Sequence, residues 1–174
     1  MLNFPPRGLE ARPFFVLSSQ TLPMTSLAEL LLAAPRRDAL IKGGAALLEK
    51  SIADRGGLTG MAYRTGYAMI KAAKPGAAQR ASKELMPGFA EALEPLFQQH
   101  LQGGGKPEVF GSSLLTHGSE AVTRMIAVAD QRVEGSSEMV RKTYARFRGN
   151  AEAEVTRILP GFAALIDQVL SEKS

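Results

Sequence analysis

Apolar positions recur every three or four residues along most of the chain after Met24. Such a period places the apolar side chains on one face of an α-helix, and no segment alternates in the way of a half-buried strand. Six stripes of this kind occur, over residues 40–52, 58–72, 78–97, 122–133, 140–147 and 151–169. The pattern predicts an all-α protein, a helical bundle of about six to seven helices.

Helix-ending and helix-starting residues separate the stripes. Ser26 and Glu29 have the S-x-x-E spacing of a capping box, which predicts a short helix ahead of the first stripe. Pro35 is expected to end that helix and begin the next. Further breaks are expected at the glycine-containing segments 55–57, 74–76, 103–106, 135–137 and 149–150.

The order of these features is repeated in the two halves of the chain. A shift of 73 residues aligns Pro160-Gly161-Phe162 with Pro87-Gly88-Phe89, and seven of 23 positions are identical between residues 71–93 and 144–166. We therefore expect two tandem three-helix repeats related by a pseudo-twofold axis: repeat one 36–100, linker 101–112 and repeat two 113–172. A kink or a helix restart is expected at each proline.

Residues 1–24 differ from the remainder, since they contain four prolines and no helical period. We expect a poorly ordered leader, or an N-terminal arm that packs Phe14 and Phe15 onto the body. Residues 25–174 are expected to form a single helical domain, because neither three-helix unit would bury much surface alone.

Composition excludes several kinds of site. The 174 residues contain no cysteine and two histidines, His100 and His117. Disulfides and thiolate ligands are therefore absent, and the histidines lack a zinc-binding spacing, so no metal and no cofactor are expected. No apolar run approaches the roughly 20 residues of a membrane-spanning helix. A cytoplasmic protein without a transmembrane segment is expected.

Positive charge is concentrated in two blocks. Residues 55–83 carry six cations and residues 139–149 carry four, and neither block contains an acid. Tyr63 and Tyr67 form an aromatic stripe with the first block at helical spacing. The candidate anion-binding residues are Arg64, Lys71, Lys74, Lys83, Arg141, Lys142, Arg146 and Arg148.

These blocks have two interpretations. Lysine and arginine cover the solvated face of most helices, and the two tyrosines could be core residues whose hydroxyls reach the surface. Alternatively, cations interleaved with aromatic rings suit nucleic-acid phosphates and bases, or the headgroups of an anionic membrane. Nothing in the sequence has the form of a recognition helix or an RNP motif.

No catalytic residues are assigned. His117, with Ser119 and Glu120 nearby, could be drawn into a Ser-His-Glu arrangement, but triad members usually come from separate elements. A helix start capped by Ser119 is the simpler interpretation. An enzyme that needs no cofactor is the least favoured function.

The segment from Lys42 to Gly76, followed by "LMPGFAEALEPLF", resembles an uncharacterised bacterial family of actinomycete type, a domain of unknown function. The resemblance rests on Gly56-Gly57, Gly60, Thr65-Gly66-Tyr67, Lys71, Lys74-Pro75-Gly76 and Pro87. It implies a small cytoplasmic helical protein and transfers no catalytic residue.

The sequence thus favours a non-enzymatic helical protein with a basic face that binds a protein partner or self-associates. The alternative is a polyanion binder that meets nucleic acid or an anionic membrane surface through its basic middle helices.

Overall fold

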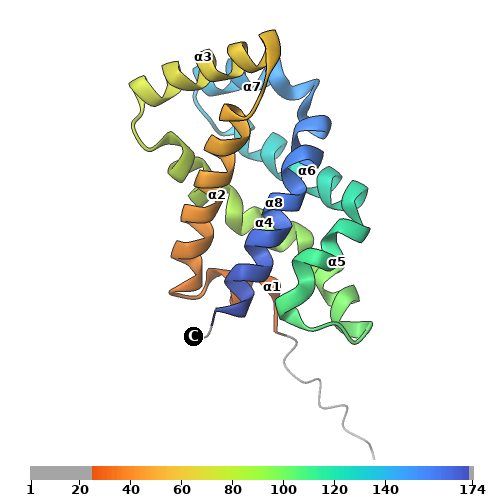
Figure 1. Cartoon of the computed structure of the whole chain (residues 1–174). Helices are drawn as coiled ribbons and strands as arrows, with labels where there is room; N and C mark the ends of the chain where they lie inside the picture. The colour runs from red at the N-terminus through yellow and green to blue at the C-terminus, as the bar shows by residue number, and fades with distance from the viewer. Residues whose placement is uncertain (1–24, 173–174) are drawn as a thin grey trace, which may run out of the picture.

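The computed structural model describes residues 25–172, and every regular element in that range is helical (Figure 1). The expected leader or arm at residues 1–24 lies outside the described residues. There are eight α-helices and one short 3₁₀ helix: α1 Leu27–Leu32, α2 Arg36–Ala53, α3 Gly57–Ala73, α4 Ala77–Gln102, η1 Pro107–Val109, α5 Phe110–Thr116, α6 Gly118–Glu134, α7 Glu138–Arg148 and α8 Ala151–Ser171. The prediction of an all-α protein is confirmed for this range.

The core is built by six of the eight helices. Its buried side chains come from α1, α2, α4, α5, α6 and α8, with Phe97, Phe110 and Ile166 among the most deeply buried. No residue of α3 or α7 belongs to it. These two helices lie together across one end of the bundle, whereas α1 and α5 lie toward the other end (Figure 1).

The two Pro-Gly-Phe triplets lie at the centre of the bundle. The Phe89 and Phe162 rings pack edge to face, with centroids 5.9 Å apart. A Cβ atom on Gly88 would lie 2.6 Å from Val128 Cγ1, and one on Gly161 would lie 2.6 Å from Leu47 Cδ1. The glycines therefore let α4 approach α6 and let α8 approach α2. Both long helices continue through their prolines without a restart.

Carboxylates on the long helices hold the two short helices in place. Glu94 on α4 accepts a hydrogen bond from the Leu27 amide at 2.7 Å. Asp167 on α8 accepts bonds from the Gly111 amide at 2.5 Å and the Ser112 amide at 3.0 Å. Each carboxylate meets amides that the first turn of a helix cannot satisfy internally.

The expected linker 101–112 contains more structure than its glycines indicated. Leu101 and Gln102 end α4, and residues 107–112 belong to η1 and the start of α5. Phe110 is buried, and its ring packs edge to face on Phe97 with centroids 5.1 Å apart. This apolar anchor explains why only residues 103–106 connect helices without being helical themselves.

The structure at the start of the described residues agrees with the prediction from the sequence. Ser26 Oγ accepts the Glu29 amide at 3.0 Å, and Glu29 Oε2 accepts the Ser26 amide at 3.1 Å. This is the expected capping box. Pro35 is the N-cap of α2, as its position between two helices predicts. In the part of the chain that the structure describes, no helix is both long and apolar enough to cross a bilayer.

Candidate functional site: the face formed by α3 and α7

Helices α3 and α7 meet through one aromatic pair. The Tyr63 ring on α3 and the Phe147 ring on α7 have centroids 4.2 Å apart and are tilted by 36°. The Arg55 guanidinium lies over the Tyr63 ring, 4.5 Å from its centroid, in cation–π geometry. The part of the first basic block that lies on α3 is therefore adjacent in space to the second block on α7.

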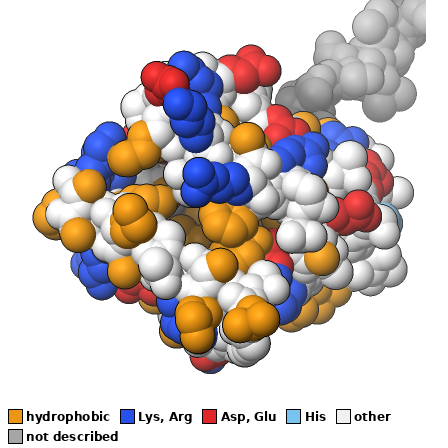
Figure 2. Space-filling model, turned by 90° about the horizontal axis from the view of Figure 1, so that it is seen from above, with side chains coloured by type: hydrophobic (Ala, Val, Ile, Leu, Met, Phe, Trp, Pro, Cys, Tyr) orange, Lys and Arg blue, Asp and Glu red, His pale blue; other side chains and the backbone are white. Residues whose placement is uncertain are grey.

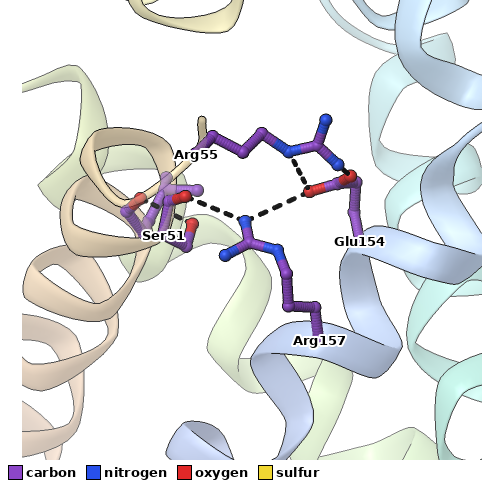
Figure 3. Close-up of polar contacts among 5 residues, drawn as sticks. Ser51, Arg55, Glu154 and Arg157 are labelled. Carbon is purple, nitrogen blue, oxygen red and sulfur yellow. Dashed lines mark hydrogen bonds and ion pairs between the residues drawn. The ribbon is translucent and has the colours of Figure 1, made fainter. Parts of the chain in front are cut away.

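A partly buried ion cluster supports this junction from below (Figure 3). Glu154 on α8 accepts hydrogen bonds from Arg55 Nε at 3.0 Å and from Arg157 Nη2 at 3.2 Å. Arg157 Nη2 also donates to the Ser51 carbonyl at 2.8 Å. The cluster ties the end of α2, which precedes α3, to α8, which follows α7.

Each helix of the face is also tied to the helix before it by a tyrosine and a carboxylate. The Tyr67 hydroxyl donates to Glu49 on α2 at 2.8 Å, and Lys71 lies 3.5 Å from the same carboxylate. Burial, and then the contact with Glu49, raises the pKa of Tyr67 to about 12. The hydrogen bond from Tyr67, followed by the charge of Lys71, lowers the pKa of Glu49 below its ordinary value.

Helix α7 has the same arrangement with different residues. The Tyr144 hydroxyl donates to Asp130 on α6 at 2.7 Å, and Arg148 binds both oxygens of that carboxylate at 2.6 and 2.8 Å. Burial, followed by Asp130, raises the pKa of Tyr144 to about 12. The hydrogen bonds from Arg148 lower the pKa of Asp130 and, in return, raise the pKa of Arg148.

Between the two helices runs a groove with a largely apolar floor and a volume of about 1060 Å³. Figure 2 shows this end of the molecule, with apolar side chains in the hollow and Lys and Arg side chains around it. The lining residues are Leu58, Met61, Ala62, Thr65, Gly66, Met69, Ile70, Ala73, Glu138, Met139, Lys142, Thr143, Arg146 and Phe147.

The apolar stripe at 58–72 does not face the core of the bundle. Leu58 is 85% exposed, Met69 is 70% exposed and Met61 is 58% exposed. Met139 on α7, at 46%, adds to the same groove. The reason is that α3 packs by its tyrosine side against α2 and α7, and no helix within residues 25–172 covers its other apolar residues. Large unpartnered apolar surfaces of this kind mark interaction sites.

The structure brings seven of the eight candidate cations to α3, α7 and the residue that ends α3. Lys83 is separate, because it lies on α4 in a shallow pocket with Arg37, Asp38 and Arg80. The candidates on α3 and at its end are Arg64, Lys71 and Lys74, and those on α7 are Arg141, Lys142, Arg146 and Arg148.

Several of these cations already have partners. Lys71 and Arg148 pair with the carboxylates described above, and Lys142 pairs with Glu138 at 2.7 Å. Arg64 donates to the Arg55 carbonyl, and Arg141 donates to the Ser136 carbonyl at 2.7 Å. Within residues 25–172, Lys74, Lys83 and Arg146 take part in none of the ion pairs.

The aromatic stripe is engaged within the protein. The Tyr63 ring contacts both Arg55 and Phe147, and its buried hydroxyl has no hydrogen-bond partner among residues 25–172. The Tyr67 hydroxyl is held by Glu49. Both tyrosines are therefore half-buried and have contacts within the protein.

His117 lines a different cleft of about 610 Å³, together with Ser119, Glu120 and Glu152. It is the residue between α5 and α6, and its Nδ1 lies 3.5 Å from the Ser113 carbonyl oxygen. Ser119 does not cap α6, because it lies inside the helix and its carbonyl accepts the Thr123 hydroxyl. Over residues 25–172, no group of three or more histidine and carboxylate side chains could hold a metal ion.

The sequence reasoning missed the carboxylates that anchor the face. Glu49 and Asp130 lie on helices preceding the basic blocks, and neither was singled out. A signal was present, since Tyr67 with Lys71 and Tyr144 with Arg148 share an i, i+4 spacing of tyrosine and cation. Such a pair on one helix face can hold a single carboxylate from a neighbouring helix.

Comparison with curated proteins and comparison with solved structures both found no match. Residues 27–170 match the model of the Family of unknown function (DUF6918). The match extends from α1 to the penultimate residue of α8, so it includes both α3 and α7. The chain therefore belongs to this family, whose members have no assigned function.

Proposed function

We propose that this protein is a non-enzymatic binding protein that docks onto an anionic membrane surface through the face formed by α3 and α7. The observation that carries the proposal is the coincidence of two features on that face. Exposed apolar side chains, Leu58, Met61, Met69 and Met139, line a groove, and Lys142 and Arg146 border it. Side chains of the first kind insert below lipid headgroups, and those of the second kind pair with lipid phosphates.

Lipid suits this face better than nucleic acid does. Binding of single strands relies on exposed aromatic rings, whereas Tyr63 and Tyr67 are engaged within the protein. Contact with a phosphate backbone does not stabilise exposed leucine and methionine side chains. Their transfer from water to the acyl region of a bilayer is favourable.

Charge also favours an anionic surface over a second copy of the chain. Residues 57–74 and 138–148 contain seven cations and one acid, Glu138, and Glu49 and Asp130 pair with two of these cations, which leaves a net charge of +4. Two such faces pressed together would bring like charges close across a largely apolar contact, at an electrostatic cost. An anionic bilayer attracts the same cations, and this attraction contributes about 1 kcal/mol for each Lys or Arg near the surface.

The test is flotation with phosphatidylcholine vesicles, with and without 30% phosphatidylglycerol, at low and high salt. We expect binding only to the anionic vesicles, and weaker binding as salt rises. Met69→Ser should reduce partitioning by roughly 5- to 30-fold, because burying a largely exposed Met contributes about 1–2 kcal/mol. Arg146→Gln should reduce it by about fivefold.

Matched controls lie at the other end of the molecule. Leu115→Ser also removes an exposed apolar side chain, and Lys106→Gln also removes one positive charge, but neither residue lines the groove. Both should float like the parent protein. Equal losses in these controls, or binding to DNA but not to vesicles, would contradict the proposal.

We also propose that the chain is a duplication of one helical unit, with α1 to α4 as the first copy and η1 with α5 to α8 as the second. Matching contacts support it: Gly88 meets Val128 as Gly161 meets Leu47, and Glu94 holds α1 as Asp167 holds α5. Glu49 and Asp130 likewise hold equivalent tyrosines.

The register of these matches supports the duplication further. Equivalent residues are 81 positions apart between α2 and α6, 77 between α3 and α7, and 73 between α4 and α8. The offset changes near the two ends of α7, which has 11 residues whereas α3 has 17, as it would after a deletion at each end of that helix. Superposition of residues 36–100 on 117–172 tests the idea. If Gly88 and Gly161 do not then coincide with their contacts, the duplication is refuted.

A further inference from the structure

A partly open pocket of about 150 Å³ lies among the helices of the bundle, and several of its lining residues, including Leu48, Leu85 and Val155, are partly exposed. It is lined by α2, α4, α6 and α8, and its walls include the two central rings, Phe89 and Phe162, and the thioethers Met86 and Met125. Its surface is almost wholly apolar.

One polar group enters the cavity wall. The Ser82 side chain lines it, Ser82 is only 4% exposed, and its Oγ has no hydrogen-bond partner within the described residues 25–172. A serine inside a helix usually bonds the carbonyl four residues back, but Ser82 does not. A buried hydroxyl without a partner is costly, and most such groups in proteins are satisfied. This hydroxyl is therefore positioned to meet a guest.

The residues that line the cavity are smaller on the side formed by the first proposed copy. Gly44 and Ser82 line it there, and a Cβ atom on Gly44 would lie 2.5 Å from Ser82 Oγ. The equivalent residues in the second copy are the larger Met125 and Val155. This comparison rests on the proposed duplication, whereas the cavity and the unpartnered hydroxyl do not.

We propose that this cavity binds a small aromatic molecule with a single hydrogen-bonding group, of the phenol class. An apolar cavity of about 150 Å³ accepts a benzene-sized ring. The edges of Phe89 and Phe162 and the sulfurs of Met86 and Met125 are favourable neighbours for such a ring. The Ser82 hydroxyl meets the polar group of the guest, so the site distinguishes phenol from benzene.

The test is a titration of the full chain with phenol and, separately, with benzene. Binding is monitored by NMR through the ¹³C-methyl signals of the methionines. Met86→Leu and Met125→Leu assign the two signals. We expect both to shift with phenol, with a dissociation constant on the order of 1 mM. Benzene should bind roughly three- to tenfold more weakly, because it leaves the hydroxyl without a partner.

Two variants separate the contribution of the Ser82 hydroxyl to binding from that of the cavity volume. Ser82→Ala should bind phenol and benzene equally, and Ser82→Val, which fills the cavity with the residue of the second copy, should bind neither. If Ser82→Val fails to unfold cooperatively, Ser82→Ala alone decides the matter. The proposal is overturned if phenol leaves both methyl signals unchanged at 10 mM, or if Ser82→Ala keeps the preference for phenol. Vesicle binding is measured separately, so the failure of one proposal leaves the other standing.

Discussion

Gly88→Ala adds one methyl group at the closest approach of α4 and α6. The new Cβ atom would lie 2.6 Å from Val128 Cγ1, about 1 Å inside the usual contact distance of 3.5–4.0 Å. Valine in a helix has essentially one side-chain rotamer, so Val128 cannot rotate away. The two helices must separate or Val128 must leave its preferred rotamer.

The magnitude follows from two opposing terms. Overpacking of this kind costs about 1–3 kcal/mol, whereas replacing a helical glycine by alanine gains about 1 kcal/mol. The expected net effect on the free energy of unfolding is a loss of about 1 kcal/mol. For a chain of this size that corresponds to a fall in melting temperature of about 2–4 °C.

Gly66→Ala is the matched control. Gly66 is also inside a helix, but no atom lies within 4 Å of the position its Cβ would take. Only the gain in helix propensity then applies, and this variant should be more stable by about 1 kcal/mol. The two variants should therefore melt on opposite sides of the parent protein.

Urea unfolding followed by circular dichroism measures these differences, and a double-mutant cycle identifies their source. Val128→Ala makes room for the new methyl group, so in that background Gly88→Ala should cost at least 1 kcal/mol less. If Gly88→Ala stabilises the protein as much as Gly66→Ala does, the close approach of α4 and α6 described above is wrong.

Three further predictions concern the polar contacts. The free energy of unfolding should fall between pH 10 and pH 12, because an unfolded tyrosine ionises near pH 10 whereas the pKa of Tyr144 is raised to about 12 in the native protein. Urea unfolding of Tyr144→Phe over this range should show a smaller fall in that free energy. Glu154→Gln leaves Arg55 without a charged partner in a partly buried site, and its free energy of unfolding should fall by about 1–3 kcal/mol, with no such fall contradicting the cluster. Asp167→Ala should cost about 0.5–2 kcal/mol and speed hydrogen exchange of the Gly111 and Ser112 amides, and unchanged exchange would show that Asp167 does not hold α5.

The helical framework could be predicted from the sequence because it depends on local signals. The period of apolar residues, the capping box at Ser26 and the glycine breaks each act within a few residues, and the helices begin and end near them. The sequence predicts equivalent positions for the two Pro-Gly-Phe triplets, but it does not predict their contacts. Gly88 and Gly161 are required by contacts with helices distant in sequence, which no local pattern records.

The face formed by α3 and α7 could be predicted only in part. Charge density placed the cations on two segments, and both segments became α3 and α7. The exposure of Leu58 and Met69 could not be foreseen, because helical periodicity identifies an apolar face without saying what covers it. The ion pairs of Lys71 with Glu49 and of Arg148 with Asp130 could not be predicted for a similar reason, because both carboxylates come from other helices.

The central claim is that the groove between α3 and α7 enters an anionic bilayer, and a single fluorescent probe tests it most directly. The chain has no cysteine, so Met69→Cys provides one labelling site in the groove and Leu115→Cys provides one outside it. An environment-sensitive dye on each is observed as vesicles with 30% phosphatidylglycerol are added. The account predicts a blue shift at position 69 and none at position 115; no shift at position 69, or equal shifts at both, would contradict it.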